Sequence, residues 1–326
     1  MQNDLTAAPI EKQQAHTWIT RSFKEKLARR TFFLVSLVPV LLFLAIVGAL
    51  LVKSWPILKA QSIWALLSGT VWQPLKGAFG FYPFIAGTFW VTLVSMFLAV
   101  PPCILTAIYL AEYANARTRS TAKPILDLLA AIPSVVYGVW GILAIVPVVK
   151  LIGPYFDEIL GFIPIFKDTN PTGFSILAGS VVLAVMVAPF IIAVTFEVLQ
   201  TVPSGVREAS LAVGATKWQT IIHAVIPHTL PGIVAGIVLG MSRALGETMA
   251  VLMVVGNVAK VPSSIFDPAY PLPALIANNY GEMMSIPLYD SALLTAALIL
   301  LVIVLFFNIL STLFLRRIKR TSVSSG

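Results

Sequence analysis

Long stretches without a charged residue are the feature that most constrains this chain. A helix crosses the hydrocarbon layer of a membrane with about 20 apolar residues, and several stretches reach that length, the first at residues 31–52. Of the 326 residues, 58% are hydrophobic and 11% are charged, whereas a soluble domain carries about 25% charged residues. The sequence therefore excludes a water-soluble globule and predicts a protein built from transmembrane helices.

Six transmembrane helices are expected. They cover residues 31–52, 84–110, 128–149, 174–196, 230–256 and 292–315. A polar segment, residues 1–30, precedes the first helix, and a basic tail, residues 316–326, follows the last. A cleaved signal peptide has a shorter apolar core nearer the start of the chain, so the first stretch is predicted to be a retained span.

The distribution of Lys and Arg predicts the orientation of these helices. Fifteen of the 22 basic residues lie in the two terminal segments and in loops 111–123 and 197–229, while six lie in the loops on the other side. Cytoplasmic segments carry the excess of Lys and Arg, so both termini are expected in the cytoplasm. This orientation accounts for the net charge of +8 without a nucleic-acid partner.

Several kinds of site are excluded or disfavoured by composition. The single cysteine, Cys103, rules out an intrachain disulfide and a cysteine-based metal site. His223 and His228 flank a proline and have no evident third ligand, so they are interpreted as interfacial residues and no metal is predicted. The chain also lacks a phosphate-binding Gly-x-x-x-x-Gly-Lys-Ser/Thr loop. It is therefore expected to be no enzyme, to bind no cofactor and to take energy for transport from a separate ATPase.

Two ionisable residues, Arg243 and Glu247, interrupt the fifth apolar stretch. An unpaired charge inside a membrane costs about 2.5–3.5 kcal/mol on insertion scales. On one continuous helix the two residues share a face and lie within reach of an ion pair. The pair could simply hold the helices in register, but charge inside a membrane is by default a sign of function, and the functional interpretation is favoured.

A guanidinium is permanently charged, and its planar fork matches two oxygens of phosphate or a similar oxyanion. Arg243 and Glu247 are therefore predicted to line a substrate pathway, together with their neighbours Ser242 and Thr248. Asn257 follows Arg243 by fourteen positions and would return to nearly the same face of an ideal helix. An Asn at this place is also typical of an ordinary helix end.

The loop between the fourth and fifth stretches, residues 202–227, contains a second regular pattern. Pro203-Ser204 followed by Glu208 is typical of a helix start, and Gly214 predicts a break after a short amphipathic helix. Two later prolines are expected to reset the chain before the fifth span. A short helix lying across the cytoplasmic face has a suitable shape for docking into a groove on another protein.

This loop resembles the signature of the inner-membrane subunits of binding-protein-dependent ABC importers, which is Glu-Ala-Ala, three residues, Gly, nine residues, Ile-x-Leu-Pro. The corresponding positions are occupied by Glu208-Ala209-Ser210, Gly214 and Ala224-Val225-Ile226-Pro227. Ser210, Ala224 and Ile226 are conservative departures from the signature. The resemblance implies a type I ABC importer permease fold over residues 84–315. It also implies that Glu208, Ala209 and Gly214 contact an ATPase subunit.

The segment from Ser242 to Ala250 carries an Arg-x-x-Gly-Glu core that is similar to the oxyanion branch of these permeases. Its continuation Glu-Thr-Met-Ala, with Ala-Ile-Pro-Ser-Val-Val-Tyr-Gly at residues 131–138, most resembles phosphate-importer permeases of the PstC type. The resemblance implies phosphate as substrate. It further implies a second, related permease subunit, a pair of ATP-binding subunits and an extracytoplasmic phosphate-binding protein. Membrane lipid is expected to surround the spans.

Alternatives remain at this point. The same architecture could import sulfate or molybdate, because a guanidinium fork alone does not discriminate among tetrahedral oxyanions. A membrane scaffold or sensor with a purely structural charged pair is a further alternative from a different class. Loop 258–290 is too apolar for a solvated linker, so it is expected to fold onto the outer mouth, where it helps to receive a binding protein or forms a packed cap.

Overall fold

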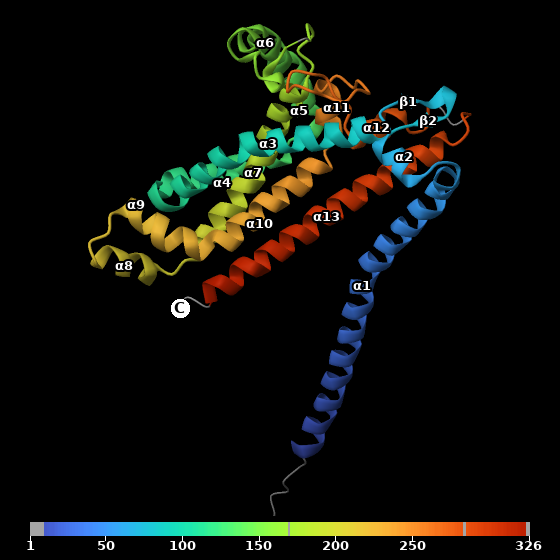
Figure 1. Ribbon diagram of the computed structural model, residues 1–326. Coiled ribbons are helices and arrows are strands. Elements are labelled where there is room, and N and C mark those ends of the chain that lie inside the picture. Colours follow the sequence, from blue (N-terminus) through green and yellow to red (C-terminus); the bar gives the residue numbers. More distant parts are fainter. Residues whose placement is uncertain (1–9, 169, 283–284, 324–326) are drawn as a thin grey trace, which may run out of the picture. The chain divides into compact units, whose positions relative to one another are not determined.

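Helices dominate the structure, as Figure 1 shows for the computed structural model, which describes residues 10–168, 170–282 and 285–323. Two compact units are present; the first ends at Lys53 and the second begins at Ser54. Within the described residues, six helices are long and apolar enough to cross a membrane. The predicted all-α membrane architecture is thereby confirmed.

One long helix, α1 (Ile10–Ala60), forms the described part of the first unit and contains the expected span 31–52. Its last two turns belong to the second unit. There Ile57 is fully buried, and its N–H donates to Ser291 Oγ over 3.2 Å. This contact fixes the end of α1 to the start of the last helix of the chain.

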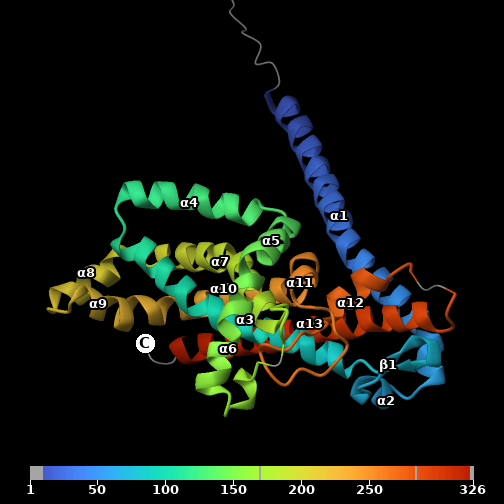
Figure 2. The same cartoon turned by 90° about the horizontal axis from the view of Figure 1, so that it is seen from above.

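Four long helices make up the bundle of the second unit. They are α3 (Tyr82–Ile108), α7 (Ile176–Gln200), α10 (Ile226–Leu245) and α13 (Tyr289–Val323), and they run side by side in Figures 1 and 2. Helix α7 packs against α3 and α10, and α13 packs against α10. Helix α7 carries apolar or small residues around nearly its whole circumference, and 67% of its membrane-length window is buried, the largest share among the six candidate spans of the described residues, so it occupies the centre of the bundle.

A stripe of glycines brings α10 into close contact with α7. Gly232, Gly236 and Gly240 lie four residues apart and face the side chains of Val198, Val194 and Ile191 respectively. A Cβ added at Gly240 would lie 2.7 Å from Ile191 Cγ1. Small residues at this spacing allow the backbones of two membrane helices to approach each other closely. The stripe therefore determines how closely α10 lies against α7.

The third span begins later than expected. Helix α4 (Ala116–Ala131) is a separate helix that starts at the N-cap Asn115, whose side chain accepts from Thr118 N over 2.8 Å. A proline disfavours helical backbone in the residue before it, and Ile132, which precedes Pro133, is extended. The span itself therefore consists of α5 (Ser134–Trp140), a π-helical turn (Gly141–Ile145) and α6 (Val146–Leu160), where residues 128–149 were predicted.

The fifth span also differs from the predicted range 230–256. It begins in the expected loop with α9 (Lys217–Thr220), continues through a π-helical turn (Ile221–Val225) into α10, and ends at Leu245. The prolines at 227 and 231 do not reset the chain: Pro227 lies in the first turn of α10, directly after the π-helical turn, and Pro231 lies inside α10. Gly246 then ends α10, and a separate short helix, α11 (Met249–Val254), follows.

The two ends of the bundle are different. One end carries α8 (Ser204–Ala212) and α9, and the other carries α12 (Leu272–Asn279), α2 (Ile63–Ser68) and a small hairpin (Figure 1). The hairpin pairs β1 (Trp72–Gln73) with β2 (Ala78–Phe79) through a 3-10 turn (Pro74–Lys76). A further 3-10 turn (Pro164–Phe166) follows α6. We call the end of the bundle that carries α8 and α9 the α8 end, and the end that carries α12 and the hairpin the α12 end.

An aromatic cluster closes the α12 end. The ring of Trp72 lies 5.0 Å from that of Phe84 and 6.3 Å from that of Tyr289, measured between centroids. The Tyr270 hydroxyl accepts hydrogen bonds from the amides of Asn278 and Asn279, and burial raises the pKa of this phenol. Leu272, Ala274 and Leu275 are fully buried, so this part of loop 258–290 folds onto the bundle as expected.

The glycine stripe yields a test of the packing. Gly232→Ala should lower the free energy of unfolding by about 1–3 kcal/mol, as overpacking usually does, because the new Cβ meets the stiff, β-branched side chain of Val198. Thermal unfolding of the purified chain in detergent measures the change. Gly48→Ala is the control, since no atom lies within 4 Å of its added Cβ. Equal melting temperatures for the two variants would contradict the packing role of the stripe.

Candidate translocation site and docking loop

Arg243 lies in the last turn of α10 and is exposed on the surface of the chain. Its guanidinium carbon lies 4.0 Å from the centroid of the Phe190 ring on α7. A cation over an aromatic face is stabilised by the ring quadrupole, and the carbonyl groups at a helix C-terminus favour positive charge. The helix end and the ring together reduce the cost of the cation, which the prediction had placed in the middle of a continuous helix.

Glu247 does not pair with Arg243. Because Gly246 ends α10, the two residues are not on one helix, and no ion pair within 4.0 Å joins them in the described part of the chain. Glu247 is half-buried, and its Oε1 accepts from Ala250 N over 3.4 Å in the first turn of α11. Arg243 and Glu247 therefore do not form the expected ion pair. Arg243 is an exposed cation before the helix break, and Glu247 is a separate carboxylate after it.

Ser242 connects α10 to α13. Its hydroxyl donates to Asn308 Oδ1 over 2.9 Å, and the Asn308 amide in turn donates to Val304 O over 2.9 Å. Ser242 is half-buried, so this hydrogen bond is a link between two helices. Sequence reasoning missed Asn308, although it is the single Asn in the last apolar stretch, 292–315.

Thr248 and Asn257 are placed differently from one another. Thr248 lies in the break, and its hydroxyl donates to Gly246 O over 3.3 Å. Asn257 follows α11 with a φ of 53°, and its amide donates to Leu252 O over 2.8 Å, which is the geometry of a helix C-terminus. It lines an open cleft of about 420 Å³ together with Asn170, Thr172 and Gly256. The predicted polar stripe from Arg243 to Asn257 is therefore interrupted.

The 202–227 loop folds as two short helices around a sharp turn. Helix α8 (Ser204–Ala212) ends before Gly214, which has a φ of 88°, and Thr216 then begins α9 with a capping box formed with Gln219. Glu208, Ala209 and Gly214, the predicted docking residues, are all exposed. The structure brings these three together on one loop at the α8 end.

Large apolar side chains surround the three docking residues. Leu211, Val213 and Trp218 expose 49%, 85% and 51% of their surfaces. Neighbouring apolar side chains exposed on a loop with charged residues mark an interaction surface. The loop thus presents an acidic residue, small residues and apolar side chains outward.

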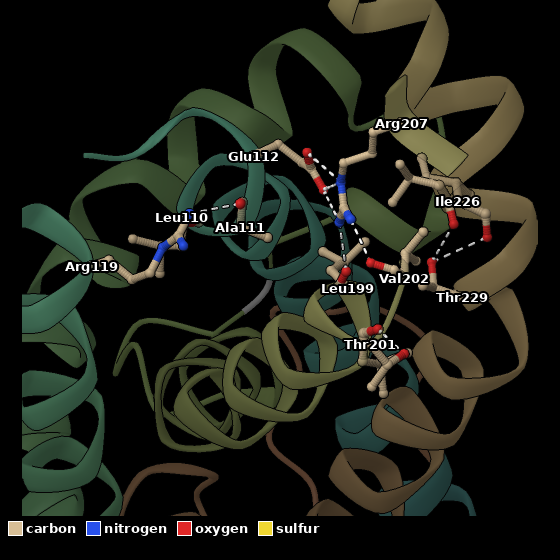
Figure 3. Close-up of polar contacts among 12 residues, drawn as sticks. Leu110, Ala111, Glu112, Arg119, Leu199, Thr201, Val202, Arg207, Ile226 and Thr229 are labelled. Carbon is tan, nitrogen blue, oxygen red and sulfur yellow. Dashed lines mark hydrogen bonds and ion pairs between the residues drawn. The ribbon is translucent and has the colours of Figure 1, made fainter. Parts of the chain in front are cut away.

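Arg207, next to Glu208, turns inward and was missed by sequence reasoning. Its guanidinium contacts the carboxylate of Glu112, with a shortest distance of 2.7 Å between Nη2 and Oε1, as Figure 3 shows. A local signal existed, since Glu112 directly follows the long uncharged run 77–111. The two residues are 95 positions apart, and no short-range pattern connects them.

Known structures share this fold. A chain of a bacterial ABC transporter involved in the import of the acidic polysaccharide alginate matches with a TM-score of 0.58 and 19% identity, covering 90% of this chain and 98% of that chain. A chain of the MetNI methionine ABC transporter in an inward-facing conformation matches with a TM-score of 0.51 and 23% identity, covering 71% and 93%. The chain therefore has the type I ABC importer permease fold.

Residues 103–320 match the family model of the binding-protein-dependent transport system inner membrane component. A PstC phosphate transport system permease from Haemophilus influenzae is 35% identical over 94% of this chain and 96% of that protein. A PstC permease from Pasteurella multocida is 34% identical over 95% and 97%. The chain belongs to the family of binding-protein-dependent transport system inner membrane components, and it is a multi-pass protein of the bacterial inner membrane.

The turn at Gly214 yields a second test. No atom lies within 4 Å of a Cβ added at this position, so a substitution acts only through the backbone. Gly214→Ala should strain the loop by about 1–3 kcal/mol. If ATP-binding subunits dock on this loop, as the sequence predicts, the variant should weaken their contact with the loop, measured by their co-purification with the chain. Gly214→Asn should weaken it less, because Asn tolerates a positive φ.

Gly205→Ala is the matched control for this turn. It lies in α8 and also has no atom within 4 Å of an added Cβ, but its φ is ordinary, and Ala favours a helix over Gly. Co-purification should be retained in this variant. Equal loss in Gly205→Ala and Gly214→Ala would show that surface shape, and not backbone conformation, determines the contact.

Proposed function

We propose that this chain is the translocation subunit of an ATP-driven, binding-protein-dependent importer of inorganic phosphate. Two curated relatives named phosphate transport system permease PstC are similar over almost the whole chain. The observation that carries the proposal beyond these names is the exposed guanidinium of Arg243, which rests on the Phe190 ring and has no ion-pair partner within 4.0 Å among the described residues.

Arg243 retains the capacity to bind an anion. Its fork of N–H donors matches two phosphate oxygens, and such bidentate contacts are among the strong hydrogen bonds in proteins. Because the side chain is exposed on one side of α10, a second, related permease subunit would complete the walls of the pathway. Binding has to be weak enough for release, and one Arg beside the separate Glu247 carboxylate meets that requirement.

The remaining partners follow from the two ends of the bundle. A pair of ATP-binding subunits would contact the 202–227 loop through Glu208, Ala209 and Gly214. The excess of Lys and Arg in the terminal segments and in loops 111–123 and 197–229 supports a cytoplasmic position for this loop and for both termini. An extracytoplasmic phosphate-binding protein would then deliver its ligand at the α12 end.

Phosphate differs from sulfate and molybdate in one respect that the site is able to use. Hydrogen phosphate keeps an O–H donor, and a carboxylate accepts a hydrogen bond from it. Glu247 is not neutralised by Arg243 and is only half-buried, which leaves one of its oxygens for this role. A carboxylate oxygen free to accept supports phosphate over anions without a proton, and Glu247 is the group that we assign to this selection.

Arg243→Gln tests the assignment of the pathway. Removing the fork should lower phosphate uptake at low external phosphate about tenfold or more, as the loss of a binding interaction made during translocation does. Uptake of labelled phosphate by the assembled complex in liposomes measures it. Lys123→Gln is the control, because this variant also removes one positive charge, and 65% of the Lys123 side chain is exposed. Uptake undiminished in Arg243→Gln would remove the residue from the pathway.

Glu247→Gln tests the choice of anion. We expect sulfate and molybdate, added in excess, to compete poorly with labelled phosphate in the unchanged complex and better in the variant. The carboxylate of Glu247 only accepts hydrogen bonds, whereas the amide of Gln also donates them and is a weaker acceptor for the phosphate O–H. Competition curves for the three anions provide the measurement. Strong competition by sulfate in the unchanged complex would support the alternative cargo.

A further inference from the structure

A bidentate ion pair joins the 202–227 loop to the end of α3. The Arg207 Nη2 lies 2.7 Å from Glu112 Oε1, and Nε lies 3.2 and 3.3 Å from the two carboxylate oxygens. The side chains are 24% and 7% exposed. A planar fork held at these distances with little solvent access is a specific and strong contact, unlike the ordinary surface ion pair.

The same guanidinium also binds the end of α7. Its Nη1 donates to Val202 O over 2.6 Å, and Nη2 donates to Leu199 O over 2.9 Å. The last carbonyl groups of a helix have no intrahelical partner, and here Arg207 supplies donors to one of them and to a carbonyl just beyond the helix. Figure 3 shows the side chain between Glu112 on one side and these two carbonyl groups on the other. One residue of α8 thereby contacts both α3 and α7.

Glu112 belongs to a π-helical turn, Tyr109–Tyr113, that ends α3. Such turns contain one residue more than an α-helical turn and occur often at functional sites. Arg119 of α4 holds this turn by donating to Leu110 O over 3.1 Å and to Ala111 O over 2.8 Å (Figure 3). The turn that presents Glu112 is therefore fixed on its other side as well.

A second contact reaches the same turn from beyond Gly214. The Lys217 Nζ lies 4.5 Å from the centroid of the Tyr113 ring. The loop thus contacts the π-helical turn from α8 and from α9.

Helix α8 fully buries none of its residues. Val206 packs in part against the core of the bundle, and Ser210 Oγ lies 3.0 Å from Thr220 Oγ1. Arg207 adds the charged contact that joins α8 to the ends of α3 and α7.

We propose that Arg207 and Glu112 are positioning residues for energy coupling: their ion pair makes the 202–227 loop move together with the ends of α3 and α7. The inference rests on the proposed function, in which ATP-binding subunits act on this loop. A displacement of α8 reaches α7, the central helix, through the carbonyl groups that Arg207 binds. Without the pair, the loop is able to move while α3 and α7 remain in place.

A purely structural role and a coupling role have different consequences. If the pair only stabilises the fold, its loss should reduce the amount of assembled complex. If the pair transmits movement, the ATP-binding subunits should still bind the exposed face of the loop and hydrolyse ATP, while phosphate transport falls. The number of phosphate ions imported per ATP hydrolysed separates the two, because it does not depend on the amount of complex.

The test compares Glu112→Gln and Arg207→Lys with the unchanged complex in liposomes that contain all its subunits. We expect the ratio of phosphate imported to ATP hydrolysed to fall about tenfold in both variants, within the usual range for coupling between two sites. Glu197→Gln is the matched control. This variant removes the ion pair between Glu197 and Lys123, in which Nζ and Oε1 are 4.0 Å apart and both side chains are about two-thirds exposed. It should leave the ratio unchanged.

A reversible tether tests the same link without relying on loss alone. In a background with Cys103→Ala, which removes the single natural cysteine, Glu112→Cys and Arg207→Cys are combined and joined by a short reducible cross-linker. The ratio should be low before cross-linking, rise after it and fall again on reduction. A fold-stabilising role alone predicts no reversible change.

The outcomes for the two proposals are distinct. If the unchanged complex hydrolyses ATP but imports no phosphate, the proposed function fails, whatever the variants do. If the unchanged complex imports phosphate, and Glu112→Gln and Arg207→Lys keep its ratio, then the coupling role of the pair is refuted while the function stands. A tether that leaves the ratio low would likewise contradict the coupling role.

Discussion

The packing of α7 between α3 and α10 is the constraint on which both candidate sites depend. The helix carries no charged residue before Glu197 and packs against α3 and α10 at once. Near its middle it provides the Phe190 ring beneath Arg243, and at its end it provides the Leu199 carbonyl that Arg207 binds. The substrate pathway and the docking loop that we propose therefore both contact the same helix.

Much of the architecture could be predicted because it follows from local composition. Uncharged runs of membrane length gave the six spans, and the pattern around Glu208 and Gly214 gave the exposed helix and its turn. The ends of the helices were less predictable. Pro133 and Gly246 each end a helix within a stretch whose hydropathy continues across them, so apolar length alone placed the last turn of α4 inside the third span and the whole of α11 inside the fifth.

The polar contacts of the candidate site were the least predictable part. The spacing of Arg243 and Glu247 indicates an ion pair only if the helix is continuous, and the break at Gly246 removes that condition. Arg207 with Glu112, and Ser242 with Asn308, join residues that are 95 and 66 positions apart. One sequence without relatives contains no signal for such pairs beyond the presence of a polar residue next to an apolar run.

The helix break has a consequence for the field that an entering anion meets. Arg243 belongs to α10 and Glu247 to the segment leading into α11, so a change in the angle between these two helices alters the separation of the two charges. Bringing the carboxylate closer screens the cation, and moving it away leaves the positive charge unscreened. The local electrostatic potential is thereby tied to helix geometry, and a bend between α10 and α11 would change how strongly the proposed site attracts an anion.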